Sequence, residues 1–222
     1  MSKGKLIVID GLDGSGKSTQ LKIAEKRLAE RNIPFKTVSF PDYGSSSSAL
    51  VKMYLNGEFS DNPDDVNAYA ASCFYAADRY ASFMKDWKND YLNGKLILAA
   101  RYVSSNAIHQ MVKLEEEQYD EYLKWLYDFE HKKLGLPEAD KVIFLDMPTG
   151  ISQKLMSERY NGDESRKDIH EAHVEYLKKR RNTALYAAKH LDWRIIECSD
   201  GQKPFSVEKI SDEIMNEISK VI

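Results

Sequence analysis

The segment from Gly11 to Ser18, which reads GLDGSGKS, is the feature that most constrains the fold of this 222-residue chain. It fits the pattern G-x-x-x-x-G-K-[ST] of a phosphate-binding loop, whose glycines let backbone N–H groups point at phosphate oxygens. The apolar run at residues 5–9 predicts a buried strand before it, and residues 21–29 continue with an apolar helical face. Strand, glycine-rich loop and helix in this order favour a phosphate site over an ordinary glycine-rich turn.

The loop residues carry the first chemical assignment. Lys17 is placed to reach the outer phosphates of a nucleotide, and the Ser18 hydroxyl is placed to ligate Mg²⁺. The nucleotide-binding residues predicted from this segment are Gly11, Asp13, Gly14, Ser15, Gly16, Lys17, Ser18 and Thr19, with Ser18 as the metal ligand.

Composition and charge narrow the class of protein. Hydrophobic residues make up 42% of the chain and charged residues 30%, which is the balance of a globular enzyme. A net charge of −3 argues against a nucleic-acid scaffold, although a local basic groove would be compatible with it. No apolar run approaches the roughly 18 residues of a membrane span, and the first residues do not form a signal-peptide pattern. With only Cys73 and Cys198 as cysteines, we expect free thiols and a cytoplasmic protein.

Five apolar runs, separated by helical stretches, predict the fold. They lie at residues 6–9, 35–40, 96–99, 142–145 and 195–198. Runs that are apolar on both faces indicate a parallel sheet covered by helices on both sides, which is a three-layer α/β/α fold. We expect one domain over residues 1–222, with a site formed by the loops after the strand ends, near Gly11, Pro41, Ala100 and Met147.

A polar segment at about residues 157–170 interrupts the helical patterning. It contains Gly162 and several charges, a composition that suits a lid over a phosphate site and equally suits a solvated loop. The phosphate-binding loop elsewhere in the chain favours the lid.

Four segments taken together carry a family resemblance. They are residues 9–20 (IDGLDGSGKSTQ), 74–80 (FYAADRY), 100–110 (ARYVSSNAIHQ) and 136–146 (LPEADKVIFLD). In this order they resemble the thymidylate kinase family, enzymes that phosphorylate dTMP with ATP. The resemblance implies a P-loop kinase fold, ATP and Mg²⁺ as co-substrate and metal, and a homodimer packed through helices beside the acceptor site.

The resemblance also implies roles in the acceptor site. Arg79 would contact the pyrimidine O4, and Tyr75, one helical turn earlier, would stack on the ring. Arg101 would grip the monophosphate, Asn106 would contact the thymine edge, and His109 would disfavour a ribose 2′-OH. The predicted substrate-binding residues are Asp13, Phe40, Pro41, Tyr43, Tyr75, Arg79, Arg101, Ser105, Asn106, His109 and Gln110.

Taken without the resemblance, the same residues have plainer interpretations. Tyr75 would be a core aromatic, Arg79 a surface charge, and His109 an interior helix histidine with one hydrogen bond.

The resemblance predicts the catalytic cations as well. Gly14 stands where one class of thymidylate kinases places an arginine, and members without it use basic residues of the lid. Arg159, Arg166 and Lys167 are the lid cations of this chain, and we rank the two arginines first because they can contact two phosphate oxygens at once. The predicted catalytic residues are Lys17, Arg159, Arg166 and Asp13.

Ala100 departs from the family pattern, which has aspartate before the Arg-Tyr pair. We expect a slower enzyme with its nucleotide sites intact, unless Asp10 or Asp146 compensates. The alternatives are a kinase for another deoxynucleotide or a catalytically impaired nucleotide-binding homologue. A GTPase-like switch is disfavoured because the chain contains no N-K-x-D segment.

Overall fold

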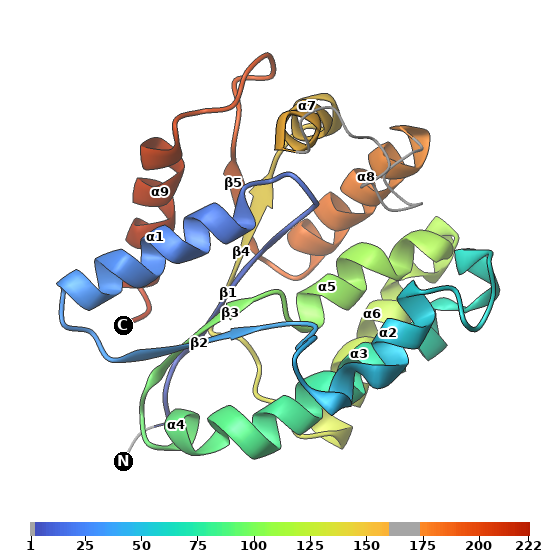
Figure 1. Ribbon diagram of the computed structural model, residues 1–222, viewed down its shortest axis with the longest axis horizontal. Helices are drawn as coiled ribbons and strands as arrows, with labels where there is room; N and C mark the ends of the chain where they lie inside the picture. Colours follow the sequence, from blue (N-terminus) through green and yellow to red (C-terminus); the bar gives the residue numbers. More distant parts are fainter. Residues whose placement is uncertain (1–2, 160–173) are drawn as a thin grey trace.

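Five parallel strands form one sheet at the centre of the molecule (Figure 1). The structure is a computed structural model that describes residues 3–159 and 174–222. The spatial order of the strands is β2-β3-β1-β4-β5, and every neighbouring pair is parallel. The strands are β1 (Leu6–Gly11), β2 (Phe35–Ser39), β3 (Leu96–Ala100), β4 (Lys141–Asp146) and β5 (Arg194–Glu197). The predicted three-layer fold and its five strands are confirmed.

Helices cover both faces of this sheet. They are α1 (Lys17–Glu30), α2 (Ala49–Leu55), α3 (Ala68–Ser82), α4 (Lys88–Leu92), α5 (Val103–His109), α6 (Tyr119–Tyr127), α7 (Thr149–Arg159), α8 (Val174–His190) and α9 (Val207–Ser219). Two π-helical turns extend them, η3 (Phe83–Trp87) after α3 and η6 (Asp128–Lys133) after α6. Helices α1 and α9 lie together on one face, and α3, α5, α6 and α8 lie on the other (Figure 1).

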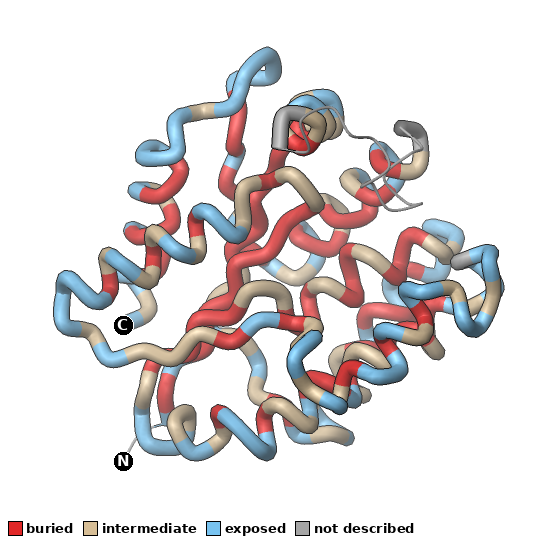
Figure 2. Tube along the Cα trace, in the orientation of Figure 1, coloured by how far each residue is buried: buried red, intermediate tan, exposed pale blue. Residues whose placement is uncertain are grey.

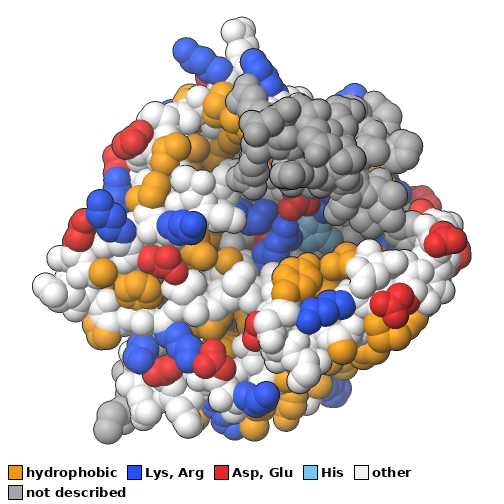
Figure 3. Space-filling view, in the orientation of Figure 1, with side chains coloured by type: hydrophobic (Ala, Val, Ile, Leu, Met, Phe, Trp, Pro, Cys, Tyr) orange, Lys and Arg blue, Asp and Glu red, His pale blue; other side chains and the backbone are white. Residues whose placement is uncertain are grey.

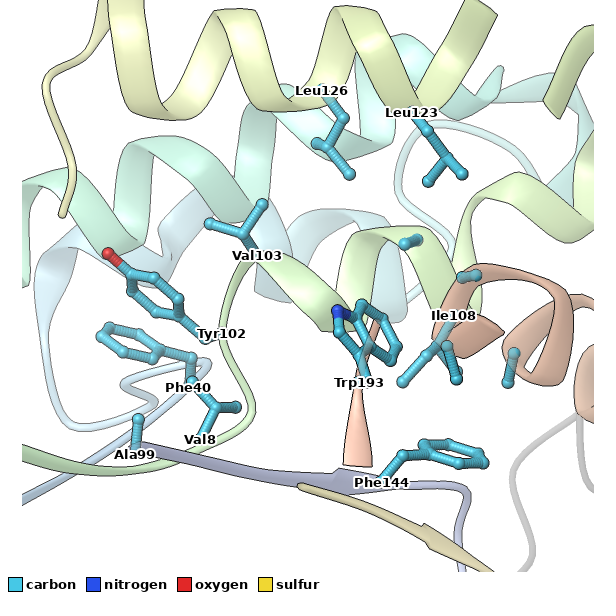
Figure 4. Close-up of a cluster of buried hydrophobic side chains, with 14 of the residues drawn as sticks. Val8, Phe40, Ala99, Tyr102, Val103, Ile108, Leu123, Leu126, Phe144 and Trp193 are labelled. Atoms are coloured by element: carbon cyan, nitrogen blue, oxygen red, sulfur yellow. The ribbon is translucent and has the colours of Figure 1, made fainter. Parts of the chain in front are cut away.

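Alternation of side chains along the strands divides the core between the two faces. Leu6 and Val8 of β1 pack under α5, α6 and α8, whereas Ile7 and Ile9 pack under α1 and α9. The central strands β1 and β3 are almost wholly buried, whereas the edge strands β2 and β5 are partly exposed (Figure 2). Figure 4 shows the first cluster, in which Val8 lies with Tyr102, Phe144 and other apolar side chains. Burial on both faces explains why the strands are continuous apolar runs rather than alternating ones.

The carboxyl ends of the central strands meet at one edge of the sheet. Ile9 of β1 pairs with Ala100 of β3, and Ala100 pairs with Ser39 of β2. The loop at residues 12–16, Phe40 and Arg101 therefore all leave the sheet at the same edge, where ligands of open α/β sheets bind.

The predicted lid at about residues 157–170 lies outside the described residues, apart from residues 157–159, which end helix α7. Among the helices that the structure describes, none is both long enough and apolar enough to cross a bilayer.

Candidate active site

The segment between β1 and α1 forms a loop that depends on glycine. Gly16 caps the helix with φ of +88°, and Gly14 has φ of +76°, conformations that glycine adopts at little cost. The loop curls around the Lys17 ammonium group, which donates to the carbonyl oxygens of Gly11 and Leu12 at 2.6 and 2.8 Å. The predicted strand, loop and helix are thus present in the expected order.

Three observations show that this loop fits bound phosphate. A Cβ added to Gly16 would meet nothing within 4 Å, so the backbone there is open to a ligand. The buried Ser15 hydroxyl has no hydrogen-bond partner among the described residues. Burial, followed by the nearby Arg101, lowers the pKa of Lys17 to about 7, and a bound anion would favour its charged form.

Gly14 lies against helix α7. A Cβ at this position would come within 2.7 Å of the Ser152 carbonyl oxygen and 3.0 Å of Met156 Cγ. A side chain at residue 14, including an arginine, would require α7 to move. A cation that contacts a phosphate at this loop would therefore have to come from another part of the chain.

A cavity of about 390 Å³ lies beside the loop, within the range of about 300–1,000 Å³ typical of small-molecule sites. All of the predicted substrate-binding residues line it: Asp13, Phe40, Pro41, Tyr43, Tyr75, Arg79, Arg101, Ser105, Asn106, His109 and Gln110. Their individual roles stay predictions. The cavity is also lined by residues that no sequence motif indicated: Ser39, Tyr54, Leu55, Lys113, Tyr176 and Arg180.

Charged side chains gather at the end of the cavity nearest the loop (Figure 3). Asp13 accepts from Arg101 at 2.7 Å and from Arg180 at 3.4 Å, and Lys17 lies 4.0 Å away. Burial opposes ionisation of Asp13, but Arg101 and then Lys17 hold the pKa of its carboxyl far below the usual range. Two arginines and the Lys17 amine thus face one carboxylate at this point.

His109 lies between the two arginines of this cluster. Its Nε2 is 2.6 Å from Arg101, and its Nδ1 contacts Arg180. Burial, followed by the two guanidinium groups, lowers the pKa of His109 well below its ordinary value, so the ring is neutral near pH 7. A neutral imidazole accepts at only one nitrogen, and the second guanidinium N–H that faces the ring is left without an acceptor there.

The interpretation of Arg79 as a surface charge is wrong. Its side chain is 1% exposed and forms a two-pronged ion pair with Glu130, which is 0% exposed. The two hydrogen bonds join Nε to Oε2 at 2.7 Å and Nη2 to Oε1 at 2.5 Å. Asn106 donates to the same carboxylate at 2.9 Å. Glu130 was not anticipated from the sequence.

Ala100 ends β3 half-buried, one residue before Arg101. The two carboxylates that could compensate for its missing acid already have protein partners. Asp10 accepts from the hydroxyls of Ser104 and Ser105 at 2.6 and 2.7 Å, and Asp146 pairs with Arg181 through two bonds of 2.7 Å.

A second cavity opens at the same edge of the sheet. It has a volume of about 510 Å³ and lies between the first turns of α7 and the loop after β5. Its lining residues are Pro148, Gly150, Ile151, Lys154, Leu155, Gly201, Gln202, Lys203 and Pro204. Helix α7 lines this cavity through Ile151, Lys154 and Leu155, and it packs on Gly14 of the phosphate-binding loop through Ser152 and Met156.

The described residues contain no group of three or more acidic, histidine or cysteine side chains that could cage a metal ion. The Ser18 side chain is exposed at the first turn of α1. Magnesium that arrives with nucleotide phosphates and keeps several waters needs only such a sparse protein contribution, so this donor set fits Mg²⁺.

A phosphate-binding loop at the end of β1 and a cation-lined cavity beside it define a P-loop phosphotransferase for a small phosphorylated acceptor. The family model described as thymidylate kinase matches residues 9–214. The chain belongs to the thymidylate kinase family, whose members are nucleoside monophosphate kinases.

Individual relatives agree with this membership. The thymidylate kinase of Mycobacterium tuberculosis is 30% identical over 188 residues, which cover 82% of this chain and 84% of the relative. That of Plasmodium falciparum is 26% identical over 219 residues, which cover 99% and 91%. A solved thymidylate kinase from Candida albicans has the same fold, with a TM-score of 0.70 and 22% identity, over 99% of this chain and 93% of that one.

Gly14→Ala should weaken ATP use and lower stability, because the new Cβ would be strained at φ of +76° and would meet Ser152. We expect a loss of about 1 kcal/mol or more in the free energy of unfolding and a higher KM for ATP. Gly135→Ala is the matched control, since Gly135 has a similar φ of +71°, a Cβ there meets nothing within 4 Å, and it lines neither of the two cavities described above. Urea unfolding and steady-state kinetics measure both effects; equal behaviour of the two variants would contradict this account of the loop.

Proposed function

We propose that the protein transfers the γ-phosphoryl group of ATP to dTMP, giving dTDP and ADP. The observation that carries this proposal is the position of the phosphate-binding loop at one end of a cation-lined cavity. The loop would hold the donor phosphates, and the cavity would hold the acceptor with its monophosphate toward the loop. Family membership favours this reaction over a kinase for another deoxynucleotide and over an impaired binding homologue.

On the donor side, the backbone N–H groups of residues 13–18 and the Lys17 ammonium would bind the β- and γ-phosphates. Ser18 would ligate Mg²⁺, which neutralises phosphate charge during transfer. The cavity between α7 and the loop after β5 would hold the adenine and ribose, because helix α7 both lines it and packs against the loop at Gly14.

On the acceptor side, Arg101 and Arg180 would hold the dTMP phosphate between them. Both guanidinium groups are kept at the cavity by Asp13 and His109. A phosphate monoester carries between −1.5 and −2 charge near neutral pH, which balances the surplus of the three cations over Asp13. The same charge means that the acceptor oxygen is already ionised, so no strong general base is required.

The remaining acceptor residues would bind the nucleoside. Tyr75 would stack on the pyrimidine, with Arg79 and Asn106 at its edge. His109 would exclude a ribose 2′-OH, and Asp13 would lie near the 3′-OH. Phe40, Pro41 and Tyr43 would wall the pocket.

Transfer would be direct and in line, since positioning and charge neutralisation provide most of the catalysis in this chemistry. We assign the neutralisation of the transferring group to Lys17 together with the lid cations. Arg166 and Lys167 lie outside the described residues, as does the side chain of Arg159.

We also propose a homodimer packed through the helices beside the acceptor cavity, and a cytoplasmic location. Two exposed apolar side chains support the homodimer, Tyr80 on α3 and Met84 on the turn after it. The exposed free thiol of Cys73 supports the cytoplasmic location, because such a thiol persists in a reducing compartment.

Lys17→Ala should abolish detectable phosphoryl transfer while leaving the protein folded. The control is Lys22→Ala, an exposed lysine on the same helix. A coupled assay with ATP, Mg²⁺ and dTMP, dCMP, dGMP or UMP measures activity and acceptor choice, and calorimetry measures binding. Turnover near the parental rate in Lys17→Ala would rule out the loop assignment, and equal use of dCMP and dTMP would rule out a thymine acceptor.

Arg180→Gln should raise the KM for dTMP by roughly 10- to 100-fold, because it removes one charge-assisted contact with the acceptor phosphate. The KM for ATP should stay within about twofold. Lys179→Gln, an exposed neighbour on α8, should change neither value. If both substrates lost affinity equally in Arg180→Gln, the residue would support the fold rather than bind the acceptor.

Ala100→Asp should raise kcat by up to about 10²-fold, since misplacing reacting groups by about 1 Å can cost that much. The new carboxylate would stand at the end of β3 beside Arg101, where it could order bound water and the acceptor phosphate. Ala100→Asn is the isosteric neutral control. Single-turnover rates at saturating substrates decide; an equal gain with asparagine would show that charge is not the missing element.

A further inference from the structure

Glu130 is a buried acid to which the family resemblance gives no role. It lies in the π-helical turn η6, is 0% exposed, and is not among the described residues that line the acceptor cavity. It nevertheless binds both side chains proposed to read the base, Arg79 and Asn106, each of which lines the cavity.

The hydrogen bonds of Glu130 determine how Asn106 is oriented. The Asn106 Nδ2 group donates to Glu130 Oε1 at 2.9 Å and to the Ser72 carbonyl oxygen at 3.2 Å. Both partners are acceptors, and only the NH₂ end of the amide can face them. The oxygen end of Asn106 is therefore directed away from Glu130.

The same carboxylate determines which part of Arg79 remains available. Nε and Nη2 are both used by Glu130, and Nη1 takes part in no hydrogen bond among the described residues. Some side-chain atoms in the described part of the chain are fully buried and have no hydrogen-bond partner, but Arg79 Nη1 and Asn106 Oδ1 are not among them. These two atoms, one donor and one acceptor, are what the pair can offer to a ligand in the cavity.

We propose that Glu130 is a positioning residue that sets the hydrogen-bonding polarity of the base pocket. It holds a donor, Arg79 Nη1, beside an acceptor, Asn106 Oδ1. A pyrimidine with a carbonyl at C4 and N–H at N3 complements this pair, whereas cytosine, with an amino group at C4 and an unprotonated N3, meets donor against donor and acceptor against acceptor. This inference rests on the proposed function, because it takes the acceptor to be a pyrimidine nucleotide.

A carboxylate at residue 130 is required to fix the orientation of Asn106, because a carboxylate only accepts hydrogen bonds. A glutamine at residue 130 could turn its own NH₂ group toward Asn106, and only the longer contact with the Ser72 carbonyl oxygen, at 3.2 Å, would then favour the original orientation of the Asn106 amide. The cavity could then present either polarity, and the preference for one edge would weaken without any change in the residues that line it.

The test compares dTMP with 5-methyl-dCMP. This nucleotide keeps the methyl group and the ring shape but exchanges the hydrogen-bond donor and acceptor at N3 and C4. In the parent protein we expect kcat/KM to favour dTMP by at least about 100-fold, because a polar pocket strongly rejects a mismatched edge. In Glu130→Gln this ratio should fall at least about tenfold, while the KM for ATP stays unchanged. Glu217→Gln is the matched control: it removes a 5%-exposed, ion-paired carboxylate of α9, far from the cavity, and should leave the ratio intact.

A role confined to stability would lower the melting temperature of Glu130→Gln and leave the ratio unchanged, which would overturn the proposal. If that variant does not fold, Glu130→Asp replaces it, since it keeps the charge and withdraws it from Asn106. The parent alone provides an independent test, because equal binding of dTMP and 5-methyl-dCMP by calorimetry would overturn the polarity. A folded parent that binds dTMP with the expected preference and turns over neither nucleotide would contradict the proposed function instead.

Discussion

The parallel pairing of β1 with β3 is the constraint on which the rest of the site depends. Because Ile9 is in register with Ala100, the phosphate-binding loop and Arg101 leave the sheet together. Arg101 has φ of +64°, a conformation that costs a non-glycine residue about 1 kcal/mol or more. Its N–H donates to Ile9 and its guanidinium to Asp13, so contacts with β1 and with the loop hold the strained residue in place. One sheet edge thereby joins the proposed donor and acceptor sites.

Basic side chains outnumber the carboxylate of Asp13 at that edge, so the cluster is suited to bind an anion. Asp13 pairs with Arg101, which follows β3, and with Arg180 of α8, and His109 stays neutral between the two arginines. Without a ligand, one hydrogen-bond donor of this cluster lacks an acceptor, since one guanidinium N–H faces a ring nitrogen of His109 that cannot accept from it. A phosphate between Arg101 and Arg180 would remove that conflict, and the same Asp13 bridges this cluster to Lys17 of the donor site.

Much of this arrangement was predictable from the sequence, because the strands are apolar runs and the loop motif has a fixed spacing. The cavity lining followed from a family resemblance. Glu130 and Arg180 were missed because each lies in a run of charges, DFEHKK and KKRR, that is typical of a solvated surface. A signal was present in both cases. Glu130 continues the buried stripe of Tyr122 and Leu126, and Arg180 continues that of Leu177 and Ala184, so each charge occupies a position where the helical period demands an apolar residue.

A charge on an apolar stripe is informative because burial of an ion pair is seldom the most stable solution. Taking two charges out of water costs several kcal/mol for each ion, and well-packed apolar residues often replace such a pair with no loss of stability. The Arg79–Glu130 pair makes sense as a device for orientation, since a fixed carboxylate can hold a guanidinium and an amide in one arrangement and apolar side chains cannot. The proposed site therefore separates two tasks: the residues that line the cavity would contact the ligand, and a buried acid behind them would decide what those contacts can recognise.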